Sequence, residues 1–422
     1  MNRFLYSVLL YIVLPFVPLK LWWRGIKQPA YRQYWRERFG FYDKSFYAKK
    51  SVKSVIWLHC VSVGETRAAE PLIKALQTQY PHHQILLTHT TPTGRETSEQ
   101  LFGDGVLRVY LPYDLPFAVQ RFLTHFQPKI GLLMETELWF NLIATCKKSH
   151  IPLLLLNARL SEKSAKGYGK LGKLVSEGLQ NLDAIAAQTV VDATRLQILG
   201  ARNVQVFGNL KFDVKPPADA YEKGLKLRAL LGKKIVFLAA STREGEESLI
   251  LEAIRDLNIL TIVVPRHPQR FDEVAQLLKD VNSKFVRRSQ LATPIDETVQ
   301  IVLGDSMGEL FSYYAACDFT FVGGSLLKFG GQNLIEPAIM GKPILIGEHT
   351  YNFADASKNA LMLGAAIQVT CVEDLREKIQ YLRDNSEARA NMQQASLQFS
   401  QASTGATLRT MEMIETHLFK SI

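Results

Sequence analysis

Two carboxylates stand directly after apolar runs in the first half of the sequence. Glu65 ends "HCVSVGE" (59–65), and Glu135 lies in "METELW" (134–139). A carboxylate in a cleft can take a proton from an attacking hydroxyl, and two carboxylates are also the catalytic pair of glycosidases. Spacing in sequence does not give the distance that would distinguish these chemistries. An acid in a helix first turn is also ordinary, because it complements the helix dipole. We expect that dipole to keep Glu65 ionised.

Three basic side chains follow other apolar runs. Lys211 in "GNLKFD" (208–213) could stabilise charge on a leaving group or on a substrate carboxylate; the alternative is a solvated lysine near a linker. Arg266 and His267 in "PRHPQRF" (265–271) stand between prolines, where a rigid turn with two donors suits a phosphate. The alternative is an ordinary surface turn.

A glycine-rich segment, "FVGGSLLKFGGQNLIEPAIMGKP" (321–343), precedes a predicted helix that starts near Asn333. Its glycines allow a backbone to approach a ligand, and the free N–H groups of the helix suit a phosphate. Glu336 could accept two sugar hydroxyls. The alternative is a flexible loop before a capped helix. The segment matches neither a P-loop nor a G-x-G-x-x-G turn.

A second turn, "GDSMGEL" (304–310), could hold a base or a ribose through its backbone and Glu309. Its alternative interpretation, which is compatible with the first, is a helix cap made by Asp305 or Ser306.

Short apolar runs alternate with helical periodicity from residue 48 onward, which predicts parallel sheets covered on both faces. Pro216 and Pro217 interrupt this alternation. We therefore expect two doubly wound Rossmann-like domains, at 48–212 and 225–422, joined by a linker at 213–224. The polar loops all follow predicted strands, where ligands bind in such sheets, and two facing domains would form a central cleft.

The N-terminal segment predicts a membrane anchor over residues 1–47. No charge occurs from Phe4 to Leu19, Pro15 and Pro18 would kink a helix, and Trp22 and Trp23 precede a series of arginines and lysines. The run is short for an upright span, so it would either cross the membrane or insert shallowly. A buried helix is the alternative, and a cleaved signal peptide is disfavoured because no small-residue cleavage site follows.

Composition limits the remaining possibilities. The 422 residues carry a formal charge of +10, which suits nucleic acid, an anionic membrane or a phosphorylated substrate. The four cysteines are scattered, which disfavours a zinc site or a disulfide framework. The chain has no D-x-D motif and no histidines at ligand spacing, so we expect no metal and no cofactor.

Six motifs together resemble one family, the 3-deoxy-D-manno-octulosonic acid (Kdo) transferases of Gram-negative bacteria. They span essentially the whole chain in the order "HCVSVGE", "METELW", "GNLKFD", "PRHPQRF", "GDSMGEL" and "GGQNLIEP". The resemblance implies a GT-B glycosyltransferase that moves Kdo from CMP-Kdo to the lipid A precursor (lipid IVA) in lipopolysaccharide biosynthesis. It also implies inversion of configuration, no metal, no nucleic-acid partner, and attachment to anionic lipid at the cytoplasmic face of the inner membrane.

The resemblance also assigns roles to individual residues. Glu65 inherits the general base, and Glu135 and Lys211 inherit transition-state stabilisation. Gln332 stands where many relatives have histidine, and its amide can neither titrate nor carry a positive charge. The inherited CMP contacts are Arg266, His267, Met307, Gly308, Glu309, Asn333, Leu334, Ile335 and Glu336.

Three other functions stay open from sequence alone. The first is a GT-B transferase that uses a UDP-sugar on a lipid or polysaccharide acceptor. The second is a non-enzymatic, basic membrane-surface module, which would not need Glu65. The third is a hydrolase, which would release free Kdo without an acceptor.

Overall fold

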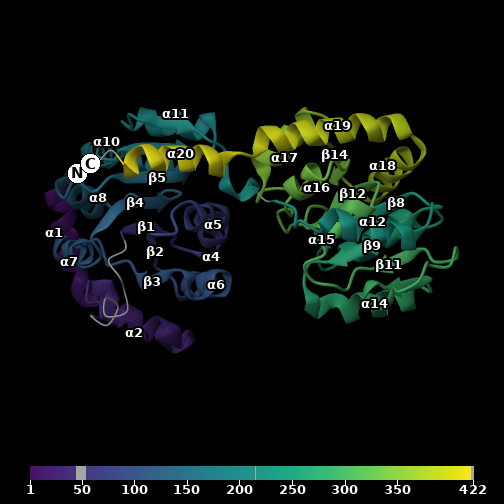
Figure 1. The fold of residues 1–422 in the computed structure, drawn as a ribbon, viewed down its shortest axis with the longest axis horizontal. Helices are drawn as coiled ribbons and strands as arrows, with labels where there is room; N and C mark the ends of the chain where they lie inside the picture. Colours follow the sequence, from purple (N-terminus) through teal and green to yellow (C-terminus); the bar gives the residue numbers. More distant parts are fainter. Residues whose placement is uncertain (44–53, 214, 420–422) are drawn as a thin grey trace. The chain divides into compact units, whose positions relative to one another are not determined.

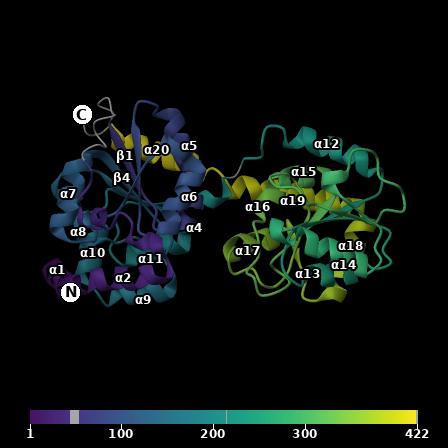
Figure 2. The same cartoon turned by 90° about the horizontal axis from the view of Figure 1, so that it is seen from below.

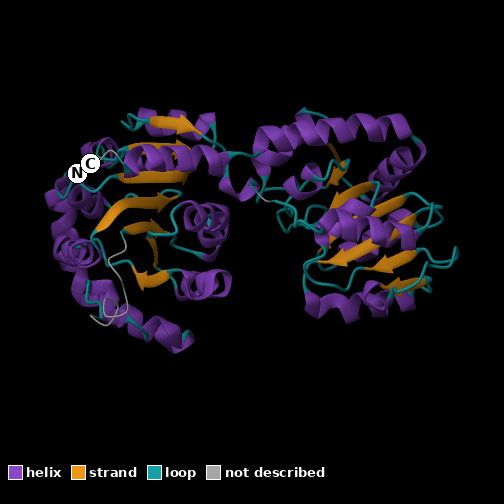
Figure 3. Ribbon diagram, viewed as in Figure 1, coloured by secondary structure: helices purple, strands orange, loops and turns teal. Residues whose placement is uncertain are grey.

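The computed structural model describes residues 1–43, 54–213 and 215–419, and the chain divides into two compact units (Figure 1). Unit 1 comprises Met1–Asp213 and Thr404–Ile422, and unit 2 comprises Val214–Ser403. The predicted boundary between residues 47 and 48 lies outside the described residues. Each unit has one parallel sheet with helices on both faces (Figure 3). The predicted fold class of two doubly wound α/β domains is therefore confirmed.

Unit 1 is built on sheet A, with the strand order β3-β2-β1-β4-β5-β6-β7 and every pairing parallel. Alternate residues of a strand face opposite sides, so Trp57 packs on Phe122 of α7 while Ile56 and Leu58 pack on the side of α5. The strands are β1 (Val55–His59), β2 (Gln84–His89), β3 (Leu107–Tyr110), β4 (Pro128–Met134), β5 (Leu153–Ala158), β6 (Ala184–Ala187) and β7 (Val204–Val206). The helices are α1 (Arg3–Val13), α2 (Val17–Lys27), α4 (Val63–Ala68), α5 (Glu70–Gln79), α6 (Pro92–Phe102), α7 (Pro116–Phe126), α8 (Phe140–Lys148), α9 (Glu162–Gly169), α10 (Lys173–Gln180), α11 (Val190–Ile198) and α20 (Ala406–Leu418).

Unit 2 is built on sheet B, with the order β10-β11-β9-β8-β12-β13-β14 and every pairing parallel. Phe237 and Phe321 pack with α13 and α18 on one face, and Leu238 packs with α12 and α15 on the other. The strands are β8 (Val236–Thr242), β9 (Leu260–Pro265), β10 (Phe285–Arg287), β11 (Ile301–Leu303), β12 (Phe319–Val322), β13 (Ile344–Ile346) and β14 (Ala366–Gln368). The helices are α12 (Ala220–Leu231), α13 (Glu246–Ile254), α14 (Phe271–Asp280), α15 (Leu310–Ala316), α16 (Ile335–Ile339), α17 (Ala354–Met362), α18 (Val372–Asp384) and α19 (Ser386–Ser403).

In each sheet the chain starts near the middle, builds one side and then continues on the other side, which creates a switch point between two central strands. In sheet A it lies between β1 and β4, and in sheet B between β8 and β12. Loops that leave two such strands in opposite directions open a crevice at their carboxyl ends, and this is where open α/β sheets bind ligands. The loop after β1 carries Glu65 and the loop after β4 carries Glu135. In unit 2 the loops after β8 and β12 carry Arg243 and the first two glycines of the glycine-rich segment.

The N-terminal segment packs along unit 1, where α1 lies beside α8 (Figures 1 and 2). The Tyr6 hydroxyl donates to Asp114 at 2.9 Å, and the Ser7 hydroxyl donates to Asn141 at 3.0 Å. A 3-10 turn, η1 (Leu14–Phe16), separates α1 from α2 at the predicted proline break. By length and composition, Arg3–Ile26 is the one stretch of the described residues apolar enough to cross a membrane, a test that signal sequences and core helices also pass.

The two ends of unit 2 differ from the sequence prediction. Helix α12 begins at Ala220, inside the predicted linker 213–224. Helix α20, predicted to belong to the C-terminal domain, belongs to unit 1, because it buries Met411 and Ile414 in the core that α5 also covers. Both oxygens of the Asp213 carboxylate accept backbone N–H groups at the start of α20, those of Gly405 and Thr407, which ties the helix to unit 1.

Candidate functional site

Glu65 is held in a fixed position at the start of α4. Ser62 is the N-cap of that helix, and its hydroxyl accepts the Glu65 N–H. The Glu65 carboxylate in turn accepts the Val61 backbone N–H at 2.8 Å and the Ser62 hydroxyl at 3.2 Å. This reciprocal arrangement is close to a capping box, and Glu65 is 8% exposed. The sequence "VSVGE" thus fixes a buried carboxylate next to a strand end.

The environment raises the pKa of Glu65 to about 7. Burial is the largest cause; the Val61 N–H opposes it, and the nearby charges of Glu135 and Glu137 add to it. The helix dipole therefore does not keep Glu65 fully ionised at neutral pH, in contrast to the expectation from the sequence. Helix α4 has only six residues, and the loss of hydration outweighs its dipole. A carboxylate with a pKa near 7 is well matched to proton abstraction at neutral pH.

Glu135 and Lys211 form an ion pair in the same unit. Lys211 Nζ lies 3.7 Å from Glu135 Oε1. Glu135 has a φ of 59°, which turns the chain after β4, so "ETE" is not an extended segment. Burial raises the pKa of Glu137 to about 7, with a smaller contribution from Glu135. The structure thus brings Glu65, Glu135 and Glu137 within electrostatic range of one another, with Lys211 paired to Glu135.

Residues that the sequence analysis did not identify hold Lys211 in place. Asn157, buried at the end of β5, accepts the Leu210 N–H at 3.0 Å through its side chain. Asn209 accepts the Lys211 N–H at 3.0 Å, and its own amide donates to Gln188 at 3.0 Å. Asn157 also has a φ of 52°. The sequence does contain a sign of this role: an asparagine follows four leucines in "LLLLNA" (153–158). A polar side chain in a buried strand needs a hydrogen-bond partner.

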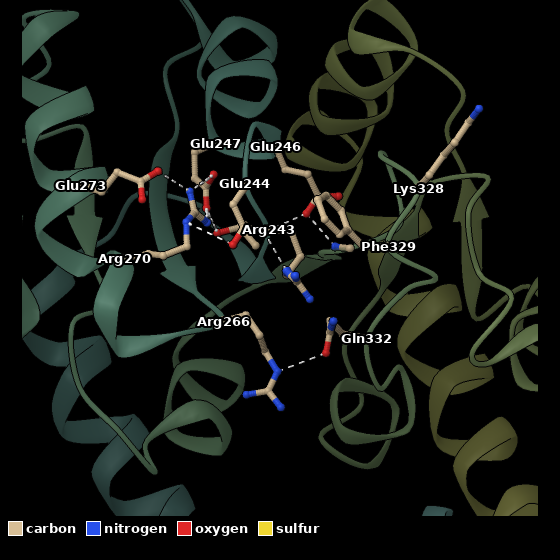
Figure 4. Close-up of polar contacts among 12 residues, drawn as sticks. Arg243, Glu244, Glu246, Glu247, Arg266, Arg270, Glu273, Lys328, Phe329 and Gln332 are labelled. Carbon is tan, nitrogen blue, oxygen red and sulfur yellow. Dashed lines mark hydrogen bonds and ion pairs between the residues drawn. The ribbon is translucent and has the colours of Figure 1, made fainter. Parts of the chain in front are cut away.

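In unit 2, Arg266 and His267 follow β9 and are both exposed. Arg266 Nε donates to the side-chain oxygen of Gln332 at 3.2 Å (Figure 4). A protonated histidine at position 332 could not accept this hydrogen bond, whereas the neutral amide of Gln332 can. Arg243, from the end of the adjacent strand β8, extends toward the same region, with its guanidinium 4.5 Å from the Phe329 ring centre.

The glycine-rich loop is organised by Glu246, another residue that the sequence analysis did not identify. This fully buried carboxylate accepts the Gly324 N–H at 2.6 Å, the Leu326 N–H at 3.0 Å and the Arg243 N–H at 2.9 Å (Figure 4). Gly324 has a φ of 69°, a conformation that glycine adopts without strain. Glu246 therefore ties the loop after β12 to the loop after β8.

Replacing Glu246 with alanine is expected to lower the affinity of unit 2 for a nucleotide by at least about tenfold. The buried Gly324 N–H and the part-buried N–H groups of Leu326 and Arg243 would lose their acceptor, and an unpaired buried group costs about 1–3 kcal/mol. Titration calorimetry with CMP would measure the effect, and thermal unfolding would report the accompanying loss of stability. Glu252→Ala, an exposed change on the same helix, is the matched control. Unchanged CMP affinity in a folded Glu246→Ala protein would contradict the prediction.

The segment from Asn333 to Glu336 forms a local hydrogen-bonded turn. The Ile335 N–H donates to Asn333 Oδ1 at 3.0 Å, so the first N–H of α16 is capped rather than free. Asn333 Nδ2 donates to Glu336 at 3.3 Å. Burial raises the pKa of Glu336 to about 7, and the charge of Arg266 opposes this effect. Leu334 and Ile335 have buried side chains, so any contact that they make with a ligand is through the backbone.

The "GDSMGEL" turn places Met307 at the surface, 65% exposed, before Gly308, which has a φ of 77°. The Glu309 carboxylate pairs with Arg288 at 3.0 Å and accepts the Ser306 hydroxyl at 2.5 Å. The proposed helix cap is wrong, because α15 has no side-chain cap and Asp305 instead accepts from Ser289. Among the described residues, no three histidine, cysteine, aspartate or glutamate side chains are grouped to hold a metal ion.

Several known proteins are similar to this chain over most of its length. The sequence profile described as "3-Deoxy-D-manno-octulosonic-acid transferase (kdotransferase)" matches residues 33–214. The chain is 38% identical to a 3-deoxy-D-manno-octulosonic acid transferase of Haemophilus influenzae over 431 aligned positions, covering 100% of both chains. It is also 38% identical to the protein of that name in Bordetella pertussis, covering 98% of this chain and 99% of the relative. The chain belongs to the Kdo transferase family.

This membership confirms the resemblance seen in the motifs and makes the chain a glycosyltransferase. The non-enzymatic alternative is therefore set aside. A solved glycosyltransferase from Rickettsia africae ESF-5 has the same fold, with a TM-score of 0.55 and 14% identity over 87% of this chain and 100% of that chain. The architecture is GT-B-like, in agreement with the fold that the resemblance implied.

Proposed function

We propose that this Kdo transferase moves Kdo from CMP-Kdo to a hydroxyl of the lipid A precursor in lipopolysaccharide biosynthesis. The observation that carries the proposal is the Glu65 carboxylate, which is fixed by two hydrogen bonds at the switch point of sheet A and has a pKa of about 7. The names of the relatives support Kdo as the sugar that is transferred. The acceptor and the residue roles are our inference.

In this mechanism Glu65 accepts the proton of a glucosamine hydroxyl on the acceptor. The resulting oxygen forms a bond to the anomeric carbon of Kdo on the face opposite CMP, and the bond from that carbon to the phosphate oxygen breaks. Configuration inverts, and CMP leaves with the bonding electrons. Glu135 and Lys211, paired at 3.7 Å, would stabilise the charges of the oxocarbenium-like transition state.

The donor residues proposed for unit 2 are Arg266, His267, the 307–309 turn and the 333–336 turn. Arg266 and His267 are exposed donors after β9, which suits a phosphate. The positive charge of Arg266 and a ring N–H of His267 would oppose the negative charge that builds on the departing CMP. A single phosphate develops less charge than a diphosphate, so these donors could serve without a metal ion.

We place the protein at the cytoplasmic face of the inner membrane, held by α1 and α2. Phe16, Leu19, Trp22, Trp23 and Ile26 are each 55–64% exposed, and exposed apolar patches of this kind mark membrane contacts. Because Tyr6 and Ser7 bind unit 1, the segment would lie along the membrane surface rather than cross it.

Replacing Trp22 and Trp23 with serine is expected to reduce binding to anionic vesicles by about tenfold or more, because two large apolar side chains leave the lipid. Flotation with phosphatidylglycerol vesicles would measure the loss. Tyr221→Ser, an exposed aromatic change in unit 2, is the control. Undiminished flotation of the double variant would contradict the anchor assignment.

The decisive experiment incubates the purified protein with CMP-Kdo and lipid IVA and identifies the lipid product by mass spectrometry. We expect the lipid mass to increase by one or more Kdo units. Parallel reactions with UDP-sugars test the alternative donor class, and a reaction without acceptor tests hydrolysis. Absence of Kdo-modified lipid would refute the proposal.

A further inference from the structure

Unit 1 contains a cavity of about 440 Å³ between α2 and the loops that follow β1, β2 and β3. One wall is a stripe on the N-terminal helices at positions 13, 16, 17, 20, 21 and 24, the spacing of one helical face. The stripe presents Val13, Phe16, Val17 and Leu21 together with the cations Lys20 and Arg24. The helix wall of the cavity is therefore mainly apolar and carries two cations.

The opposite wall holds an arginine, Arg38, whose N–H donors are only partly used. Arg38 is only 4% exposed and lines the cavity. Its Nη1 donates to the Thr90 carbonyl at 3.0 Å, but its Nε and Nη2 find no acceptor among the described residues. The guanidinium lies 4.0 Å from the Tyr110 ring centre, a cation–π contact that uses its face and leaves its N–H edge for another partner.

Arg38 forms no ion pair with a carboxylate among the described residues. The buried neighbour Glu37 pairs with Arg95 at 2.8 Å. Tyr113, whose N–H donates to the Arg38 carbonyl at 2.9 Å, has its phenol within hydrogen-bonding reach of Arg38. That phenol is neutral, so it does not balance the charge of the guanidinium. A buried, incompletely paired guanidinium is costly unless something compensates it. An anionic group that reached Arg38 would supply the missing acceptors.

A chain of hydrogen bonds connects this cavity to the proposed base. Arg38 donates to the Thr90 carbonyl, and the hydroxyl of the next residue, Thr91, donates to the Val61 carbonyl at 3.0 Å. The Val61 N–H in turn binds the Glu65 carboxylate at 2.8 Å. Val61 and Glu137 also line the cavity. The cavity therefore borders the backbone segment that holds the Glu65 carboxylate.

We propose that this cavity is the site for a phosphate group of the acceptor glycolipid, held by Arg38 with Arg24 and Lys20, while its acyl chains follow the apolar stripe of α2. The inference rests on the proposed function and adds the residues that select a phosphorylated lipid. Guanidinium groups bind phosphate through two parallel N–H donors, and Arg38 has two donors free. The exposed tryptophans of α2, outside the stripe, would contact the membrane from which the lipid enters.

The test compares lipid IVA with the same lipid from which a phosphatase has removed the phosphates. Binding is measured without CMP-Kdo, for the full-length wild type and for Arg38→Met and Arg24→Ala. We expect Arg38→Met to weaken binding of lipid IVA by about tenfold or more, the range for a hydrogen bond to a charged group. Arg24→Ala, at an exposed position, should weaken it by about twofold to fivefold. Neither change should alter binding of the dephosphorylated lipid.

Arg36→Ala is the matched control, because this exposed cation belongs to the same short helix, η3 (Trp35–Phe39), and does not line the cavity. It should change neither affinity. Arg24→Ala keeps the test valid if Arg38→Met does not fold. Three results would each overturn the proposal. The variants could lose the same affinity for both lipids, Arg24→Ala could keep full affinity for lipid IVA, or the variants could lose as much affinity for vesicles that contain only phosphatidylglycerol.

The binding assay separates this inference from the proposed function. If the wild type binds lipid IVA selectively but transfers no Kdo to it, the cavity assignment survives and the proposed reaction fails. If Kdo transfer occurs but the variants do not distinguish the two lipids, the reaction survives and the cavity assignment fails.

Discussion

Replacing Glu65 with glutamine is expected to lower kcat by about 10²- to 10⁴-fold, the range for loss of a general base. Glutamine is nearly isosteric and keeps an oxygen that can accept the Val61 N–H now bound at 2.8 Å. The fold and CMP binding should therefore be retained. Steady-state kinetics with CMP-Kdo and lipid IVA would measure kcat, and calorimetry with CMP would show that unit 2 is unaffected.

Glu70→Gln provides the control for that experiment. Glu70 lies in the first turn of the next helix, α5, and pairs with Lys74 at 2.7 Å near the surface. It should keep nearly full activity, which would show that the effect at Glu65 is not a general effect of removing an acid from a helix start. A Glu65→Gln protein with more than about a tenth of wild-type kcat would rule out the assignment.

The activity of the wild type should rise with pH through about 7, because Glu65 accepts a proton only when ionised and its pKa is about 7. Initial rates measured between about pH 5.5 and pH 9 would show this acidic limb of the pH–rate profile, in which the rate rises with pH. The apparent value belongs to Glu65 and Glu137 together, since both have pKa values of about 7 and both interact with Glu135. The residual activity of Glu65→Gln should no longer rise with pH in this range. If its pH dependence is unchanged, the titration belongs to another group.

The same pKa predicts an effect on stability with a defined sign. The pKa of Glu65 is raised on folding, so its contribution is fully present below its unfolded value near 4.5 and is lost as pH rises through about 7. Above pH 7 the folded protein holds a poorly hydrated charge that glutamine does not carry. Glu65→Gln should therefore unfold at a temperature equal to or above that of the wild type at pH 8. Loss of activity together with equal or greater stability would mark a functional residue.

The sequence was sufficient to predict the alternation of strands and helices and the loops that carry the candidate side chains. Those loops follow from two local rules, that apolar runs form buried strands and that ligands bind at their carboxyl ends. Glu65 and Glu135 could be selected in this way because each directly follows a strand. Their common location depends on the strand order, in which β1 lies beside β4, and no local pattern contains that order.

The features that could not be predicted depend on burial and on contacts between distant segments. The pKa of Glu65 depends on its desolvation and on Glu135 and Glu137, about seventy residues away. Glu246 lies in the first turn of α13, yet it accepts the N–H groups of residues 324 and 326, about eighty residues away. Helix α20 returns to unit 1 because its apolar face fits the α5 side of sheet A, and its sequence contains no sign of which domain it covers.

Replacing Lys211 with methionine is expected to lower kcat by about 10²- to 10³-fold, the range for removing one preorganised group that stabilises a transition state. Methionine keeps much of the length of the side chain and removes the charge. Because the Lys211–Glu135 pair is partly exposed, its loss should change stability by only about 1 kcal/mol or less. Kinetics and thermal unfolding of the same preparation would separate the two effects. Lys166→Met, at an exposed lysine that pairs with Glu162, is the control.

The double variant Lys211→Met/Glu135→Gln decides how the pair acts. If Lys211 only neutralises Glu135, removing both charges should restore much of the activity that the single lysine change removes. If each residue contacts a different part of the reacting sugar, the losses in kcat should add on a free-energy scale. We expect addition, because the ion-pair distance of 3.7 Å is longer than a charge-assisted hydrogen bond and leaves both groups able to engage a substrate. Recovery of activity in the double variant would instead make Lys211 a positioning residue for Glu135.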